Sequence, residues 1–190
     1  MMGIIKCRSV DDCFSNDITG NLHIKSLLSG KKFKKILRYL HLNDNEKKSN
    51  DPVFKVKKLV DLMNKKFKKY WVPNQKVAVD EAIVPTKSTT SGIRVYMKDK
   101  PDKWGIKIWK LVDSKKYLYE FQIYCGKKEN QQVEHGLGPN VVRKLSATLP
   151  QGKPWMIYAD NFFSTVELME ELYEKGTFFT GTIKGNRKRV

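Results

Sequence analysis

The sequence has few of the residues that build zinc sites and disulfide-stabilised domains. Among 190 residues it contains only the scattered cysteines and histidines Cys7, Cys13, Cys125, His23, His41 and His135. No two cysteines have the CxxC spacing of a zinc site, so we treat them as isolated thiols and predict no zinc site. An odd, sparse cysteine count is typical of a reducing compartment, which favours the cytoplasm or nucleus over secretion.

Long apolar runs and several catalytic motifs are also missing. No apolar stretch is long enough to span a membrane, and the N-terminus has no charged-then-apolar leader. We therefore expect an intracellular protein without a membrane partner. The chain has no Walker-type phosphate loop, no GxSxG nucleophile elbow and no HExxH zinc motif. The enzymes that depend on those motifs are excluded.

Acidic residues are scarce relative to basic ones. The chain has 37 Lys and Arg residues against 20 Asp and Glu residues, which gives a formal net charge of +17. Such a charge attracts polyanions through counterion release and electrostatic steering, so nucleic acid is the first expected partner. A merely lysine-rich composition is the alternative. The length suits one domain of ordinary size, with or without a smaller helical piece.

Two amphipathic helices are predicted before residue 75. Ser29 can cap the first, whose apolar residues recur at i, i+3, i+4 and i+7: Phe33, Ile36, Leu37 and Leu40. The second starts at Asp51-Pro52, and its apolar stripe consists of Val56, Leu59, Val60, Met63, Phe67 and Tyr70. Lysines cover the other face of both helices, where they either contact DNA or form an ordinary solvated surface.

The apolar spacing changes from helical to extended after Pro73. Strands are predicted at 76–84, 104–112, 117–125, 154–160 and 177–184, with a hairpin turn at 113–116. One helix is predicted from Asn140, and another from a capping box at 164–167 to Gly176. The order β-β-β-α-β-α-β predicts an α/β fold, in which helices cover a mixed sheet.

Two aspartates stand where a purely structural role is less expected. Asp80 lies inside a β-branched run, where an ionised carboxylate loses solvation unless it meets a cation or several donors. Asp160 ends an apolar strand, and ligands bind at the carboxyl ends of strands in α/β sheets. On neighbouring strands the two carboxylates can bind a hard cation such as Mg²⁺. The alternatives are a simple turn at Asp160-Asn161 and a solvent-facing Asp80-Glu81 on an edge strand.

Six segments resemble, in order and spacing, the successive motifs of the piggyBac transposases. They are FKKILRYLHLNDN from Phe33, VDEAIVPTK from Val79, YMKDKPDKWGIKIW from Tyr96, YLYEFQIYCGKK from Tyr117, YADNFFST from Tyr158 and GTIKGNRK from Gly181. Because the blocks cover nearly the whole chain, the resemblance is more specific than any single motif. It extends to the piggyBac-derived proteins that hosts have domesticated.

The resemblance implies a ribonuclease-H-like catalytic domain with three aspartates, which hold two Mg²⁺ ions for DNA strand cleavage and transfer. On this chain it makes Asp80 and Asp160 catalytic and metal-binding residues. It also implies DNA partners (terminal inverted repeats or a TTAA target), a nuclear location, and a homodimer. The candidate DNA-binding residues are Lys31, Lys32, Lys34, Lys35, Arg38, Lys65, Lys66, Lys87, Arg94 and Lys103.

The chain departs from the family pattern after Asp160. The acids that follow are Glu167, Glu170, Glu171 and Glu174, and none corresponds to the third aspartate. The family's cysteine-rich domain and most of its N-terminal region are also missing, and STTSG replaces a Gly-Arg pair after Lys87. We expect a helical dimerisation and DNA-binding region at 1–75 and a C-terminally truncated catalytic domain at 76–190. We expect no strand cleavage by this chain; the alternative function is a non-catalytic DNA-binding or chromatin-associated module.

Overall fold

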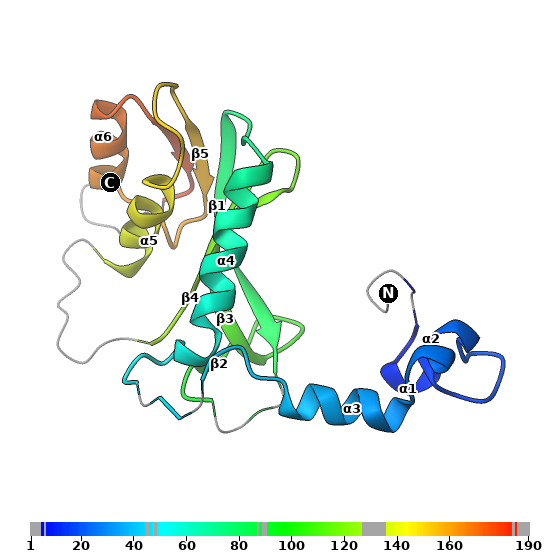
Figure 1. Cartoon of the computed structure of the whole chain (residues 1–190). Coiled ribbons are helices and arrows are strands. Elements are labelled where there is room, and N and C mark those ends of the chain that lie inside the picture. The colour runs from blue at the N-terminus through cyan, green and yellow to red at the C-terminus, as the bar shows by residue number, and fades with distance from the viewer. Residues whose placement is uncertain are drawn as a thin grey trace. The chain divides into compact units, whose positions relative to one another are not determined.

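The computed structural model describes residues 5, 7–44, 46–47, 49–86, 88, 91–126, 136–183 and 185. The chain forms two compact units, Met1–Asn45 and Glu46–Val190. The first unit is helical and the second contains the sheet (Figure 1). None of the helices in the described ranges combines the length and the apolar character that a membrane crossing requires.

The described residues of the N-terminal unit form three short helices, and a side chain caps the first turn of each. The helices are α1 (Val10–Cys13), α2 (Leu22–Leu27) and α3 (Gly30–Tyr39), and the caps are Ser9, Asn21 and Ser29. A disulfide joins Cys7 to Cys13. The expectation that these two cysteines are isolated thiols is therefore wrong, because it considered only CxxC spacing.

The helix predicted after Ser29 is confirmed as α3, but its apolar stripe is only partly covered within the N-terminal unit. Phe33 packs against Phe14, with ring centroids 5.7 Å apart. Ile36, Leu37 and Leu40 are 49%, 51% and 60% exposed. The amphipathic pattern therefore identified the helix correctly, although most of its apolar face meets solvent.

A mixed sheet forms the centre of the larger unit. Its strands are β1 (Lys76–Pro85), β2 (Arg94–Tyr96), β3 (Trp104–Asp113), β4 (Leu118–Ile123), β5 (Met156–Ala159) and β6 (Phe178–Gly181). The spatial order is β2-β3-β1-β5-β6, and β4 also pairs with β3. β1 is antiparallel to β3 but parallel to β5, and β5 is parallel to β6. The predicted mixed sheet is confirmed; β2 was missed because three residues are too few to show alternation.

Helix α4 (Phe54–Tyr70) packs against β4 (Figure 1). Its buried residue is polar: Asn64 Nδ2 donates to Phe121 O (2.9 Å), and Phe121 N donates to Asn64 Oδ1 (3.1 Å). The Phe67 ring lies 6.0 Å from Tyr117 and 6.3 Å from Phe121. The predicted boundary at residue 75 grouped this helix with the N-terminal helices, whereas these contacts place it in the same compact unit as the sheet.

Helices α5 (Leu137–Ser146) and α6 (Val166–Glu174) contribute to one hydrophobic core with the sheet. The core combines apolar side chains from the four strands β1, β3, β4 and β5, from both helices, from the loop before β5 and from the turn after it. Its fully buried members include Val77, Val79, Leu111, Val142, Leu145, Ile157, Phe163 and Leu168. Because this core holds β1 and β5 together, it also sets the relative position of the residues that follow them.

Both of these helices begin at a different residue from the one predicted. α5 starts at Leu137 rather than with Asn140 as its cap, and Gly136 precedes it with φ of 80°. α6 is capped by Thr165, the second residue of the predicted capping box, rather than by Ser164. The pattern located each helix but not its first residue; Ser164, the predicted cap of α6, instead donates its hydroxyl to the Asp160 carbonyl.

Candidate functional site

The register of the sheet places Asp80 beside Asp160. β1 and β5 run parallel, and their last paired residues are Val79 and Ala159. Asp80 is the next residue of β1, and Asp160 is the first residue after β5. Because neighbouring strands lie about 4.8 Å apart, the two backbone positions are adjacent at one edge of the paired region. The strands are therefore neighbours, as the site interpretation requires.

A hydrogen-bonded turn holds Asp160 at the end of β5. Phe162 N donates to Asp160 Oδ1 (2.9 Å), and Phe163 N donates to the Asp160 carbonyl (3.2 Å). Ser164 Oγ donates to the same carbonyl (2.7 Å). Phe163 is buried in the core, whereas Asp160 is exposed. The turn that was the structural alternative does exist, and it presents a solvent-accessible carboxylate.

Two glycines allow other segments to approach this turn closely. A Cβ on Gly138 of α5 would lie 2.2 Å from Phe162 O. A Cβ on Gly181 of β6 would lie 2.2 Å from Ser164 Oγ and 2.8 Å from Ala159 O. Any larger residue would displace the turn. Sequence reasoning did not single out these glycines. Gly181 lies inside a predicted strand, where an isolated glycine was an available signal, whereas Gly138 precedes the helix predicted from Asn140.

Asp80 is more exposed than its β-branched surroundings suggested. Its side chain is 53% exposed, and its Oδ2 lies 3.1 Å from Lys110 Nζ. The Asp80 carboxylate therefore loses only part of its solvation, and Lys110 is the cation that a carboxylate at this position was expected to meet. The solvent-facing alternative is therefore partly right: Asp80 is accessible, but β1 is an interior strand of the sheet rather than an edge.

The neighbouring acid, Glu81, binds lysines instead of joining Asp80. Its Oε2 lies 2.6 Å from Lys107 Nζ and its Oε1 lies 3.6 Å from Lys100 Nζ. The Lys107 ammonium also lies over the rings of Trp109 and Phe162, at 4.2 and 5.3 Å from their centroids. Because Phe162 belongs to the Asp160 turn, these contacts connect β1 and β3 to that turn.

In the parts of the chain that the structure describes, no group of three His, Cys, Asp or Glu side chains is placed to hold a metal ion. Asp80 and Asp160 are two carboxylate residues at neighbouring backbone positions. A cation held there would need further ligands, such as water or substrate phosphate.

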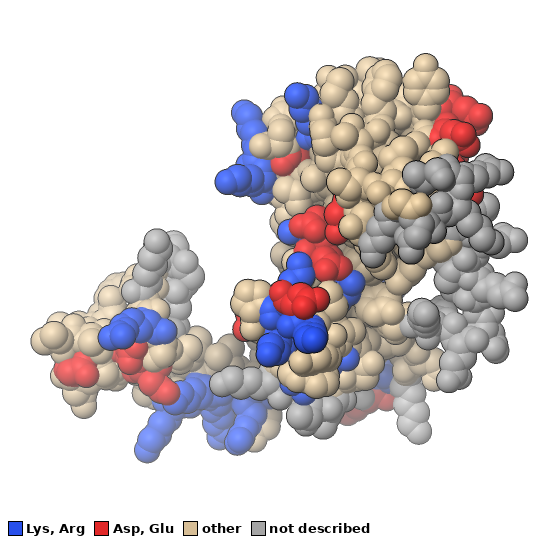
Figure 2. All heavy atoms as spheres, turned by 180° about the vertical axis from the view of Figure 1, so that it is seen from behind, with Lys and Arg blue, Asp and Glu red and all other residues tan. Residues whose placement is uncertain are grey.

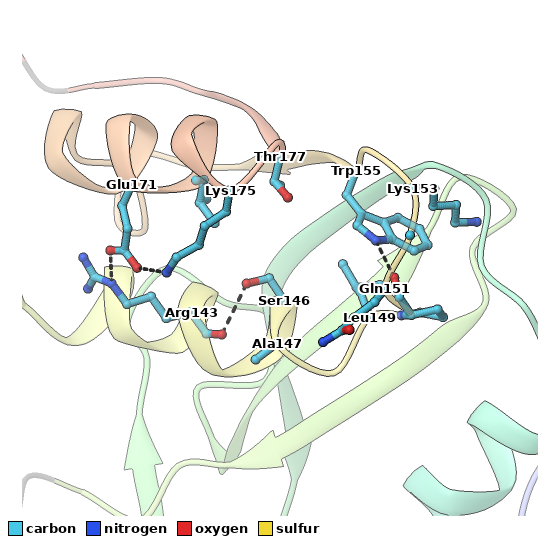
Figure 3. Close-up of a pocket in the computed structure, with 13 residues that line it drawn as sticks. Arg143, Ser146, Ala147, Leu149, Gln151, Lys153, Trp155, Glu171, Lys175 and Thr177 are labelled. Atoms are coloured by element: carbon cyan, nitrogen blue, oxygen red, sulfur yellow. Dashed lines mark hydrogen bonds and ion pairs between the residues drawn. The ribbon is translucent and has the colours of Figure 1, made fainter.

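Glu171 on α6 is engaged elsewhere, in a pocket of about 410 Å³ between α5, α6 and the loop before β5 (Figure 3). Its carboxylate lies 2.7 Å from Lys175 Nζ and 2.6 Å from Arg143 Nε. Hydrogen bonds from Lys175 and then Arg143 lower the pKa of Glu171. The pocket includes Trp155, which precedes β5, whereas Asp160 follows it. The pocket therefore lies toward the opposite end of that strand.

The predicted DNA-binding residues of α3 form one basic surface. Lys31, Lys32, Lys34, Lys35 and Arg38 are all exposed, and most of them line a shallow hollow beside Tyr39. Lys34 also forms an ion pair with Asp11. Figure 2 shows basic and acidic groups on the visible face of both units, and a group of basic atoms gathers along the lower margin of the N-terminal unit.

The remaining candidates are spread over the larger unit. Lys65 and Lys66 are exposed on α4. Arg94 and Lys103 line one hollow together, where the Arg94 guanidinium lies 4.4 Å from the centroid of the Trp104 ring. Lys87 lies outside the described residues. The structure therefore unites the α3 residues but does not merge the others into a single site.

Comparisons with known proteins agree with this architecture. The family model described as Transposase IS4 matches residues 1–190. Human PiggyBac transposable element-derived protein 3 is 30% identical over 171 residues, which cover 86% of this chain and 28% of that protein. Human PiggyBac transposable element-derived protein 2 is 30% identical over 161 residues, which cover 82% and 27%.

Among solved structures, the cryo-EM structure of a piggyBac transposase synaptic complex with hairpin DNA matches with a TM-score of 0.85 and 26% identity, over 96% of this chain and 38% of that chain. The fold is therefore the ribonuclease-H-like fold of a transposase catalytic domain. Within that class, the chain belongs to the piggyBac-type transposase family. It spans less than a third of the length of the curated relatives it matches.

Proposed function

We propose that this chain is the part of a piggyBac-type transposase that carries two of the three catalytic carboxylates and contacts DNA. The observation that supports this most directly is the parallel register of β1 and β5, which makes Asp80 and Asp160 neighbours. Asp160 follows the carboxyl end of β5, a common ligand-binding position in α/β sheets, and Asp80 stands beside it in the middle of β1, which continues to Pro85. Family membership suggests the reaction class, DNA strand cleavage and transfer.

The two carboxylates suit a hard divalent cation such as Mg²⁺, which binds oxygen ligands and keeps several waters. Asp80 and Asp160 would hold it, and the Lys110 ammonium 3.1 Å from Asp80 already occupies a cation position beside one of them. When bound, such an ion stabilises charge during displacement at a phosphate. The chain's own contribution is orientation: the β1–β3 ladder positions Asp80, and the turn after β5 positions Asp160.

The 190-residue chain is expected not to cleave DNA by itself, because two carboxylates without a third hold the ions of a two-metal site poorly. A nicking assay with Mg²⁺ or Mn²⁺ on DNA that carries terminal repeats tests this, with Asp80→Ala as the matched control. Equal and negligible cleavage by both proteins is the expected result. Robust cleavage that Asp80→Ala abolishes would overturn the inactivity but support the site.

DNA is the proposed partner, the nucleus the proposed location, and a homodimer the proposed assembly. The net charge of +17 and the exposed cations of α3 support DNA binding. The exposed Ile36 and Leu37 on α3 provide apolar surface that a dimer contact would cover. Fluorescence anisotropy over a salt series tests DNA binding, and light scattering tests dimer formation. DNA binding that does not depend on salt would contradict the electrostatic DNA contact. A protein that stays monomeric at all concentrations would contradict the homodimer.

A non-catalytic DNA-binding or chromatin-associated module is the second candidate. The Lys110–Asp80 ion pair favours it, because that carboxylate already has a cation from the protein itself. This module would bind DNA equally well with Mg²⁺ or with a chelator, and binding would survive Asp160→Asn. DNA binding that Mg²⁺ strengthens, and that Asp80→Asn or Asp160→Asn makes insensitive to Mg²⁺, would favour the carboxylate site instead.

A further inference from the structure

A lysine lies beside one of the two candidate metal ligands. Lys110 and Asp80 are direct cross-strand partners in the antiparallel β1–β3 ladder, with Nζ and Oδ2 3.1 Å apart. Directly opposite residues project on the same face of a sheet. The side chains of Lys110 and Asp80 are 29% and 53% exposed, so both remain accessible to ions. The sheet register therefore keeps this ammonium close to Asp80.

The strand that carries Lys110 is held from both sides. Lys110 faces Asp80 on β1 and Phe121 on β4. The Phe121 backbone is bound in turn by Asn64 of α4, through hydrogen bonds of 2.9 and 3.1 Å. The backbone of Lys110 cannot move away, whereas its ammonium can still swing on a flexible four-carbon stem. A fixed backbone with a flexible side chain allows the Lys110 ammonium to move from one anionic partner to another.

We propose that Lys110 is a built-in counter-cation that competes with a divalent ion for Asp80 until DNA arrives. The proposal rests on the function proposed above. Without DNA, the ammonium neutralises Asp80 and repels an incoming divalent ion. A DNA phosphate at the site accepts the ammonium in a charge-assisted hydrogen bond and offers the ion an additional oxygen ligand. Lys110 thereby makes ion binding depend on DNA.

The expected size of the effect follows from Coulomb's law. A single positive charge about 5 Å from a divalent ion, even with screening as strong as that of bulk water, changes the ion's affinity on the order of tenfold. Charge, rather than the shape of the side chain, should decide the result. Replacement of Lys110 by Arg should therefore preserve the effect, and replacement by an uncharged residue should remove it.

The test is a titration of the full 190-residue chain with Mn²⁺ alone, in which electron paramagnetic resonance counts the free ion. Lys110→Met is expected to bind Mn²⁺ on the order of tenfold more tightly than the unmodified chain, and Lys110→Arg within about twofold of it. Lys100→Met is the matched control, because Lys100 is also a partly exposed lysine on a carboxylate but pairs with Glu81. It should leave the affinity unchanged. Lys110→Gln is a second neutral variant, and circular dichroism verifies that each variant is folded.

Equal Mn²⁺ affinities for the unmodified chain, Lys110→Met and Lys110→Gln would overturn the counter-cation proposal. If Asp80→Asn still weakened binding in that case, the carboxylate site of the proposed function would stand. Asp80→Asn and Asp160→Asn should each abolish the gain in the Lys110→Met background; a gain that survives both would place the ion elsewhere and overturn both proposals. Added duplex DNA should reduce the tenfold difference in Mn²⁺ affinity between Lys110→Met and the unmodified chain. If DNA leaves that difference unchanged, the proposal that Lys110 moves from Asp80 to a DNA phosphate is refuted.

Discussion

Asp113 is the buried carboxylate whose replacement by Asn should destabilise the larger unit most clearly. It is 5% exposed and stands at the end of β3. Its Oδ2 accepts a hydrogen bond from Trp71 Nε1 (2.7 Å), and its Oδ1 accepts from the backbone N–H groups of Lys115 (2.9 Å) and Tyr117 (3.0 Å). One side chain thus joins the segment after α4 to the β3–β4 turn.

The structure gives the expected magnitude. A hydrogen bond to a charged group contributes about 1.5–3 kcal/mol, and a buried donor left without a partner costs about 1–3 kcal/mol. An Asn side chain retains one acceptor but turns an NH₂ group toward the other donors. Asp113→Asn should therefore lower the free energy of unfolding by about 3 kcal/mol. Asp61→Asn, at an exposed position on α4, is the matched control and should change it by less than about 0.5 kcal/mol.

The same contacts predict how the difference depends on pH. Burial by itself raises the pKa of Asp113, but hydrogen bonds from Trp71, Tyr117, Lys115 and Asn74 outweigh it and hold the pKa below its usual value of 3.8. Because the folded-state pKa is depressed, the carboxylate stabilises the fold above the unfolded-state pKa. That stabilisation is lost as the pH falls through the folded-state pKa. The difference in the free energy of unfolding between the unmodified protein and Asp113→Asn should therefore become smaller in acid.

Urea unfolding followed by tryptophan fluorescence, at pH 7 and near pH 3, measures both effects. The reasoning would be refuted if Asp113→Asn and Asp61→Asn unfolded at the same urea concentration at pH 7. It would also be refuted if the gap between Asp113→Asn and the unmodified protein widened on acidification.

Three further sets of substitutions test the packing around the site, the attachment of α4 and the basic surface. Gly138→Ala would place a Cβ 2.2 Å from Phe162 O. It should lower the free energy of unfolding, measured in urea, by about 1–3 kcal/mol and shift the NMR amide resonances of the Asp160 turn. Unchanged resonances would argue against the close approach of Gly138 to this turn. Asn64→Ala removes both hydrogen bonds to Phe121 and should cost about 2 kcal/mol, whereas the exposed Lys65→Ala should cost almost nothing; equal costs would show that the Asn64 bonds do not hold α4. The third set replaces the α3 cations by Gln: Lys31, Lys32, Lys34, Lys35 and Arg38. A plot of log DNA affinity against log salt concentration should become less steep, by about one unit of slope for each phosphate contact that is lost. An unchanged slope would exclude these residues from the DNA interface.

Features that depend on neighbouring residues were predictable from the sequence. The stripe from Phe33 to Leu40 has helical spacing, and α3 occupies that segment. Two apolar runs flank the polar residues 113–116, the second of them alternating, and β3 and β4 form the expected hairpin. In these cases the apolar period is a local property of the chain, so no knowledge of distant contacts was needed.

Features that depend on distant residues were not predictable in the same way. Asn64 is one polar residue beside an apolar stripe, and only the position of β4 explains its burial. In the sequence, Lys110 lies between apolar residues like an ordinary solvent-facing lysine of a strand. Only the β1–β3 register, which places it opposite Asp80, shows that it can pair with that carboxylate. For Asp80 and Asp160, spacing alone left simpler roles open, and the family resemblance supplied the pairing before the β1–β5 register explained it.

The geometry of α6 explains why its glutamates are unsuited to complete the carboxylate pair. The helix begins shortly after the Asp160 turn and leads back to β6, which runs parallel to β5. Each turn of α6 therefore takes its side chains farther from the carboxyl end of β5, where Asp160 lies. Glu171 is already in the pocket that includes Trp155, bound to Arg143 and Lys175. If the proposed site takes a third carboxylate, that group would have to come from a segment that reaches the carboxyl end of β5, where Asp160 stands beside Asp80 and its partner Lys110.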